Sequence, residues 1–118
     1  MTADDVDSWV AAYRRAWESN DASDIAALFT EDARYLTEPY AAPWVGHDAI
    51  VSGWFEHRDE PGDTTFAHEI VAVCDGLAFV RGHTTYASPP REYSNLWMID
   101  LAPDGRAREF TEWWMEHR

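Results

Sequence analysis

The chain has 118 residues and a formal net charge of −13, from 22 acidic and 9 basic side chains. A chain of this length buries one core, so we expect residues 1–118 to form a single domain. The acidic balance repels phosphate backbones and anionic lipids, which argues against nucleic acid and membranes as partners. Neither a membrane-length apolar run nor a basic-then-apolar leader is recognised, so the expected location is the cytoplasm.

Aromatic residues are frequent, with 7 Trp, 5 Tyr and 5 Phe. Rings of this size fill a core, line a cavity or cover a subunit interface. The only cysteine, Cys74, has no partner for an internal disulfide and lies in the apolar run V-A-V-C. We therefore interpret Cys74 as a buried core thiol.

The first half of the chain has the periodicity of helices. An amphipathic helix is predicted over Asp5–Ser19. Its apolar face consists of Val6, Trp9, Val10, Tyr13 and Trp17. Asp21 is a suitable N-cap for a second, short helix. The buried side of that helix consists of Ile25, Leu28 and Phe29. A third helix is predicted to begin after Gly46 and to end before Pro61.

The stretch Ala33–His47 combines one carboxylate with large rings. A short strand within Thr30–Leu36 leads into it, and Glu38 is extended because it precedes a proline. Pro39 and Pro43 stiffen the loop that follows. The sequence therefore predicts the wall of a small-molecule pocket around Glu38.

Beyond Asp63 the pattern changes to that of strands. Four strands are predicted, near residues 64–74, 77–87, 92–101 and 106–116. The turn signals between them are Asp75-Gly76, Ser88-Pro89-Pro90 and Pro103-Asp104-Gly105. The order of helix, helix, strand, helix and antiparallel meander predicts an α+β domain with its helices on one side of a bent sheet.

Four motifs span nearly the whole chain: A-Y-R-R-A-W-E-S-N-D, I-A-A-L-F-T-E-D-A-R-Y, G-H-D-A-I-V-S-G-W-F and D-G-R-A-R-E-F-T-E-W-W. On these motifs the chain resembles the SnoaL-like branch of the nuclear transport factor 2-like superfamily. The resemblance implies a cone-shaped α+β barrel, with three N-terminal helices packed on a strongly curved, mainly antiparallel sheet. It also implies a homodimer through the exposed face of the sheet. The superfamily includes ketosteroid isomerases, scytalone dehydratase and polyketide cyclases, so the fold alone does not define a reaction.

The resemblance to ketosteroid isomerases implies Tyr13 as the oxyanion donor and Glu38, before a proline, as the catalytic base. The second oxyanion acid of that family has no carboxylate counterpart here, since its place falls near Trp97. Scytalone dehydratase has tyrosines, histidines and an asparagine in its pocket. Residues of these types here are Tyr13, His68, His83 and Asn95.

Two of the candidate catalytic residues precede the predicted meander. In a ring-lined cavity, desolvation would raise the pKa of Glu38 toward the working pH, whereas at an exposed rim Glu38 would be an ordinary carboxylate. Tyr13 either donates a hydrogen bond to a developing oxyanion or packs within the helical layer.

The other two candidates, His68 and Asn95, belong to the meander. His68 is at least as able to face a cavity as His83, whose polar neighbour Arg81 favours the convex face. Asn95 either orients a ligand or is a buried residue satisfied by the sheet. Glu112 lies on the opposite strand face from Glu109, and the pattern leaves open which face lines the pocket. The candidate substrate-binding residues are Trp17, Tyr40, Trp44, Trp54, Trp97 and Glu112.

The sequence lacks a compact metal-ligand motif, a nucleophile elbow and a glycine-rich phosphate loop, so we expect neither a metal nor another cofactor. One hypothesis is a cofactor-free isomerase, dehydratase or cyclase that uses acid-base chemistry on an apolar substrate bearing a carbonyl or hydroxyl. The alternative is a non-catalytic domain for ligand binding or dimeric assembly, in which the same rings fill space or meet a partner.

Overall fold

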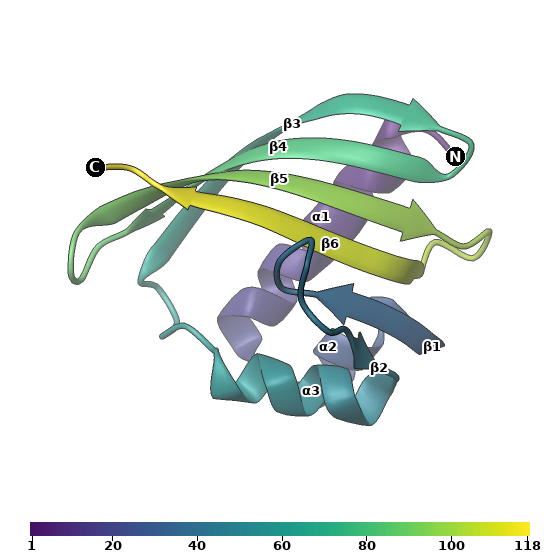
Figure 1. Ribbon diagram of the computed structural model, residues 1–118, viewed down its shortest axis with the longest axis horizontal. Coiled ribbons are helices and arrows are strands. Elements are labelled where there is room, and N and C mark those ends of the chain that lie inside the picture. The colour runs from purple at the N-terminus through teal and green to yellow at the C-terminus, as the bar shows by residue number, and fades with distance from the viewer.

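Three helices and one six-stranded sheet make up the computed structural model, which describes residues 1–118 (Figure 1). In chain order the elements are α1 (Ala3–Ser19), α2 (Ala22–Ala26), β1 (Phe29–Leu36), β2 (Trp44–Val45), α3 (His47–Glu56), β3 (Thr64–Cys74), β4 (Leu77–Tyr86), β5 (Arg91–Leu101) and β6 (Ala107–Glu116). The strands lie in the order β2-β1-β6-β5-β4-β3, and only β1 and β6 pair in parallel. The predicted α+β class and mainly antiparallel sheet are confirmed.

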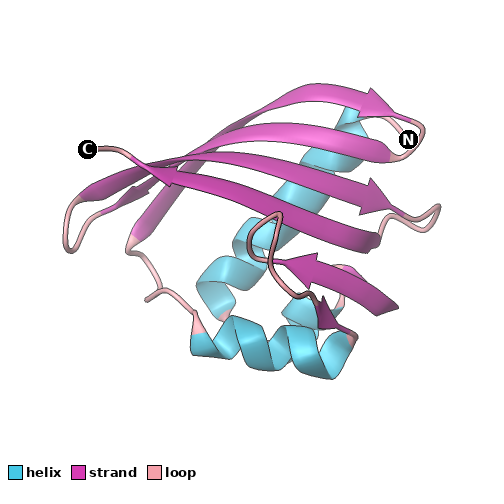
Figure 2. Cartoon of the chain, in the orientation of Figure 1, coloured by secondary structure: helices cyan, strands magenta, loops and turns pink.

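The sheet curls over α1, and Figure 2 shows all three helices on the same side of it. Trp9 of α1 joins the two layers: its ring stacks on Phe110 and meets Phe29 and Trp97 edge-on. Its indole N–H donates to the carbonyl of Leu28 at 3.0 Å. Because all these rings are buried, the core lies between α1 and the concave face of the sheet.

The helix boundaries differ slightly from the prediction. α1 begins before Asp5 because Thr2 caps it: the Thr2 hydroxyl accepts from the Asp5 amide, and the Asp5 carboxylate accepts from the Thr2 amide. Asp21 caps α2 as predicted. Leu28 and Phe29 are buried, but the prediction that they belong to this helix is wrong, since α2 ends at Ala26 and Phe29 begins β1.

Strand alternation separates core residues from those on the convex face. Val80 of β4 and Trp97 of β5 are buried against the helices. Arg81 and His83, one and three residues after Val80 on β4, are exposed on the other face, as their polar character favours. None of the helices has the length and apolar character that crossing a membrane requires.

The buried position expected for Cys74 is wrong, because this thiol is exposed. The pairing of β3 with β4 shifts register between Ile70 and Ala72. An extra residue in one strand inverts the alternation that follows it, so Val73 packs against the core and Cys74 points outward.

Candidate functional site

A cavity of about 450 Å³ opens between the C-terminal end of α1, the segment that joins β1 to α3, and the β4–β6 part of the sheet. Nine aromatic residues line it: Tyr13, Trp17, Tyr35, Trp44, Trp54, Tyr86, Tyr93, Trp97 and Trp114. Its other lining residues are Thr37, Glu38, His57, Arg58, Asp59, Thr84, Asn95 and Glu112. Pockets of this size and aromatic character are typical of small-molecule sites.

Glu112 of β6 lies on the cavity wall between two side-chain donors. Its Oε2 accepts hydrogen bonds from the Trp97 indole N–H and the Asn95 amide, each at 2.9 Å. Asn95 is itself fixed, because its Oδ1 accepts from the Thr84 hydroxyl at 2.7 Å. Oε1 of Glu112 has no hydrogen-bond partner in the protein and is not enclosed, so this oxygen opens into the cavity.

Burial raises the pKa of the Glu112 carboxyl, although the hydrogen bonds from Trp97 and Asn95 work in the opposite direction. Desolvation outweighs these two donors because the charged form has lost most of its water. A carboxylate of this kind holds a proton closer to neutral pH than an exposed one does. It is therefore suited to accept and return a proton.

Tyr13 of α1 and Tyr35 of β1 share a buried hydrogen bond of 2.7 Å between their hydroxyls. Burial is the main cause that raises the pKa of both phenols, and the nearby charge of Glu112 adds to it. Both rings therefore keep their protons at any physiological pH. Since one hydroxyl donates to the other, one O–H remains to donate into the cavity.

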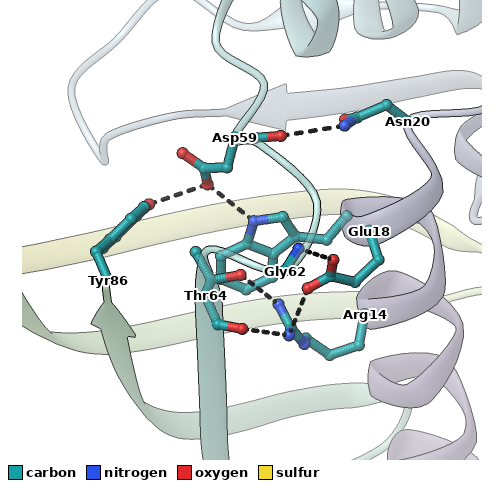
Figure 3. Close-up of polar contacts among 8 residues, drawn as sticks. Arg14, Glu18, Asn20, Asp59, Gly62, Thr64 and Tyr86 are labelled. Atoms are coloured by element: carbon teal, nitrogen blue, oxygen red, sulfur yellow. Dashed lines mark hydrogen bonds and ion pairs between the residues drawn. The ribbon is translucent and has the colours of Figure 1, made fainter. Parts of the chain in front are cut away.

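Asp59, in the loop between α3 and β3, is a second carboxylate of the cavity (Figure 3). Its Oδ2 accepts from the Trp17 indole N–H at 2.8 Å and from the Tyr86 hydroxyl at 3.0 Å. Burial, followed by the charge of Asp59, raises the pKa of Tyr86. The carbonyl of Asp59 accepts from the Asn20 amide at 3.2 Å, which ties the loop to the end of α1.

The same loop is fixed at a second point (Figure 3). The Gly62 amide donates to Glu18 Oε2 at 2.7 Å, and Glu18 also pairs with Arg14 at 3.1 Å. Arg14 donates in turn to the hydroxyl and carbonyl of Thr64, at 3.0 and 3.1 Å. Polar groups of α1 thus hold the segment that carries Asp59 beside the cavity.

Glu38 lies at the rim of the cavity and is partly exposed. Its Oε2 accepts a hydrogen bond from the Tyr40 hydroxyl. Tyr40 itself is 82% exposed and does not line the cavity, so the predicted place of this ring in the pocket wall is wrong.

His68 does not reach the cavity either. It lies on the helix side of β3, where its ring stacks on Phe66 and its Nε2 lies 2.8 Å from the Asp7 carboxylate of α1. This contact holds the N-terminal part of α1 against β3. The predicted catalytic position of His68 is therefore not supported by the geometry.

Most of the other candidate residues lie around this one cavity. The sequence-predicted residues that line the cavity are Tyr13, Trp17, Glu38, Trp44, Trp54, Asn95, Trp97 and Glu112. Tyr35, Asp59 and Tyr86 are site residues that the sequence analysis did not find. Alternation within β1 offered a signal for Tyr35, whereas Asp59 lies in a loop without periodicity.

Acidic, histidine and cysteine side chains do not gather in groups of three or more that could hold a metal ion. The polar groups of the cavity are instead arranged as donors and acceptors of hydrogen bonds. The arrangement is suited to holding and moving protons beside an apolar ligand.

The fold and its aromatic cavity define an α+β cone of the NTF2-like type. Residues 10–115 match the model of the SnoaL-like domain, so the chain belongs to the SnoaL-like family. No curated protein matched the sequence.

Several solved structures share the fold. A protein from Kribbella flavida DSM 17836, provisionally described as a ketosteroid isomerase, has a TM-score of 0.72 at 19% identity, covering 98% of this chain and 81% of its own. An NTF-2 like protein of unknown function from Burkholderia xenovorans LB400 has a TM-score of 0.75 at 12% identity, with coverages of 98% and 86%. A ketosteroid isomerase-like protein from Erwinia carotovora atroseptica SCRI1043 has a TM-score of 0.64 at 20% identity, with both coverages at 90%.

Proposed function

We propose that the protein is a cofactor-free isomerase, dehydratase or cyclase that transfers protons on an apolar substrate bearing a carbonyl or hydroxyl. The observation that supports this most directly is Glu112, a half-buried carboxylate whose pKa is raised by desolvation and which has one oxygen open to an aromatic cavity. The family and the fold are compatible with this class of chemistry.

In this proposal Glu112 replaces Glu38 as the proton-transfer group. Trp97 and Asn95 hold its Oε2, which leaves Oε1 to face the substrate. The Tyr13–Tyr35 pair supplies an O–H to a substrate oxygen that gains negative charge. Glu38 stays at the rim, where it accepts a hydrogen bond from the exposed Tyr40.

A generic proton-abstraction probe tests the base without knowledge of the natural substrate. In 5-nitrobenzisoxazole a base removes the ring C–H proton while the N–O bond breaks, which gives a coloured nitrophenolate. General-base catalysis typically contributes about 10²–10⁴-fold, so we expect Glu112→Gln to lose roughly 100-fold in rate. The wild-type rate should rise with pH through the raised pKa of Glu112, because only the ionised carboxylate accepts a proton.

Glu38→Gln and Glu109→Gln are the matched variants for this assay. Glu109 lies on β6 like Glu112 but does not line the cavity, so its substitution should leave the rate unchanged. Glu38→Gln should reduce the rate only a few-fold. A wild-type rate equal to that in buffer, or a Glu112→Gln rate equal to that of the wild type, would contradict the proposal.

We also propose that the chain forms a homodimer through the convex face of the sheet. Exposed apolar side chains on this face are the observation that favours such an assembly role. Leu96 and Met115 are 37% and 71% exposed on this face, and Trp113 beside them is half-buried. An open depression of about 640 Å³ crosses the strands there. Light scattering at micromolar concentration should give twice the chain mass, and a monomer would refute the proposal.

The cytoplasmic location stays a prediction, which cell fractionation tests.

A further inference from the structure

Acidic residues outnumber basic ones in the lining of the cavity. Three of its lining residues are carboxylates: Glu38, Asp59 and Glu112. The only arginine or lysine among them is Arg58. Its guanidinium extends over the ring of Phe55, 5.9 Å from the centroid, and Phe55 does not line the cavity. Acidic groups therefore outnumber basic ones in the lining, and its one arginine is exposed and forms no ion pair with the three carboxylates.

Two further arginines lie close to the cavity but do not line it. Arg91 covers the ring of Tyr86 at 4.1 Å, and Arg14 covers the ring of Trp17 at 4.4 Å. Arg14 is already paired with Glu18. Both contacts show that rings of this wall accept a positive charge on their faces, as aromatic rings do.

The carboxylates receive their hydrogen bonds from uncharged donors. Glu112 accepts from Trp97 and Asn95, and Asp59 accepts from Trp17 and Tyr86. Neither carboxylate has an ion-pair partner. A partly desolvated negative charge that only neutral groups stabilise is one that a cationic ligand would stabilise further.

We propose, resting on the small-molecule function proposed above, that the substrate of this cavity carries a cationic nitrogen on an apolar, ring-bearing body. The aromatic wall holds the apolar body, and the open Oε1 of Glu112 faces the ammonium. The three carboxylates repel anionic ligands. Neutral ligands bind through the rings and the Tyr13–Tyr35 hydroxyls but gain nothing from the negative charge.

Calorimetric titration with three ligands of one scaffold tests this at pH 7.5. The ligands are (2-naphthylmethyl)trimethylammonium, 2-naphthylmethanol and 2-naphthylacetate. Cation–π contact and a desolvated charge pair together are worth several-fold to a hundred-fold, so we expect the cation to bind at least about ten-fold more tightly than the alcohol. The acetate should give no measurable heat of binding.

Substitutions then assign the preference to Glu112. Glu112→Gln keeps an acceptor for Trp97 and Asn95 but removes the charge, so the cation should lose about ten-fold in affinity while the alcohol is unchanged. The matched control is Glu109→Gln on the other face of β6, which should bind all three ligands as the wild type does. Circular dichroism checks that both variants are folded.

The outcomes separate the two proposals. Equal binding of cation and alcohol, or tighter binding of the acetate, would overturn the cation preference and leave the small-molecule cavity intact. A preference that persists in Glu112→Gln would overturn the assignment to Glu112. Absence of binding by all three ligands would contradict the cavity as a ligand site and, with it, the proposed function.

Discussion

Glu112 is a residue of the candidate site whose ionised form lowers the stability of the folded protein. Its pKa is raised mainly by burial, which means that the folded protein binds this proton more readily than the unfolded chain does. The contribution of Glu112 to the free energy of unfolding is therefore greatest below the ordinary pKa of a glutamate. This contribution decreases as the pH rises through the raised pKa, because the ionised carboxylate is less well solvated in the folded protein than in the unfolded chain.

Glu112→Gln should remove this loss of stability. Above the raised pKa the variant should unfold at a higher temperature than the wild type, by roughly 4 °C for each kcal/mol recovered in a domain of this size. Thermal melts from pH 4 to pH 8 measure this, with Glu109→Gln as the control. Parallel curves of melting temperature against pH for wild type and Glu112→Gln would show that the carboxyl is not desolvated as described.

At the scale of the elements, the packing of α3 depends on the close contact of Gly53 with the Trp44 ring. A Cβ built on Gly53 would overlap the Trp44 indole, which lines the cavity. Gly53→Ala gains about 1 kcal/mol of helix propensity but overpacks the contact at a cost of about 1–3 kcal/mol. We expect a net loss of stability in urea unfolding and weaker ligand binding. The control is Ser52→Ala, because Ser52 is exposed on the same helix; it should neither lower the stability nor weaken ligand binding. A Gly53→Ala variant more stable than the wild type would show that Trp44 moves aside freely.

The loop between α3 and β3 depends on α1. Glu18→Ala removes the acceptor of the Gly62 amide and the partner of Arg14. Hydrogen exchange over residues 57–63 should become faster by roughly ten-fold, since a hydrogen bond to a charged group is worth about 1.5–3 kcal/mol. Glu56→Ala is the control, because Glu56 is exposed near this loop on α3. Unchanged exchange in Glu18→Ala would mean that the contacts of Asp59 and Asp63 are enough to hold the loop.

The elements were predictable where the chain carries local signals. Asp75-Gly76 adopts positive φ angles of 49° and 87°, and the strands on both sides end where this turn predicts. The bulge after Ile70 has no such signal, which is why the prediction for Cys74 failed. Alternation placed Glu109 and Glu112 on opposite faces, but only packing against α1 decides which face is concave.

At the scale of the whole molecule, charge opposes the proposed dimer. Each chain carries −13, so two copies repel one another at low ionic strength. The electrostatic screening length falls from about 10 Å at 0.1 M salt to about 3 Å at 1 M. Because salt screens the repulsion, the dissociation constant of the dimer should fall by roughly ten-fold over that range. Sedimentation at several salt concentrations measures this. Met115→Glu should be monomeric throughout, whereas a dimer that weakens with salt would indicate an interface held by ion pairs.

The parallel pairing of β1 with β6 sets the order in which the molecule can be assembled. β6 lies between β1 and β5, and it contributes both Phe110 to the core and Glu112 to the cavity. While the chain is being synthesised, the sheet has a gap at its centre until residues 107–116 have left the ribosome. Cooperative folding and a complete cavity therefore require β6, and until it is available the nascent chain exposes the apolar surfaces that β6 would cover.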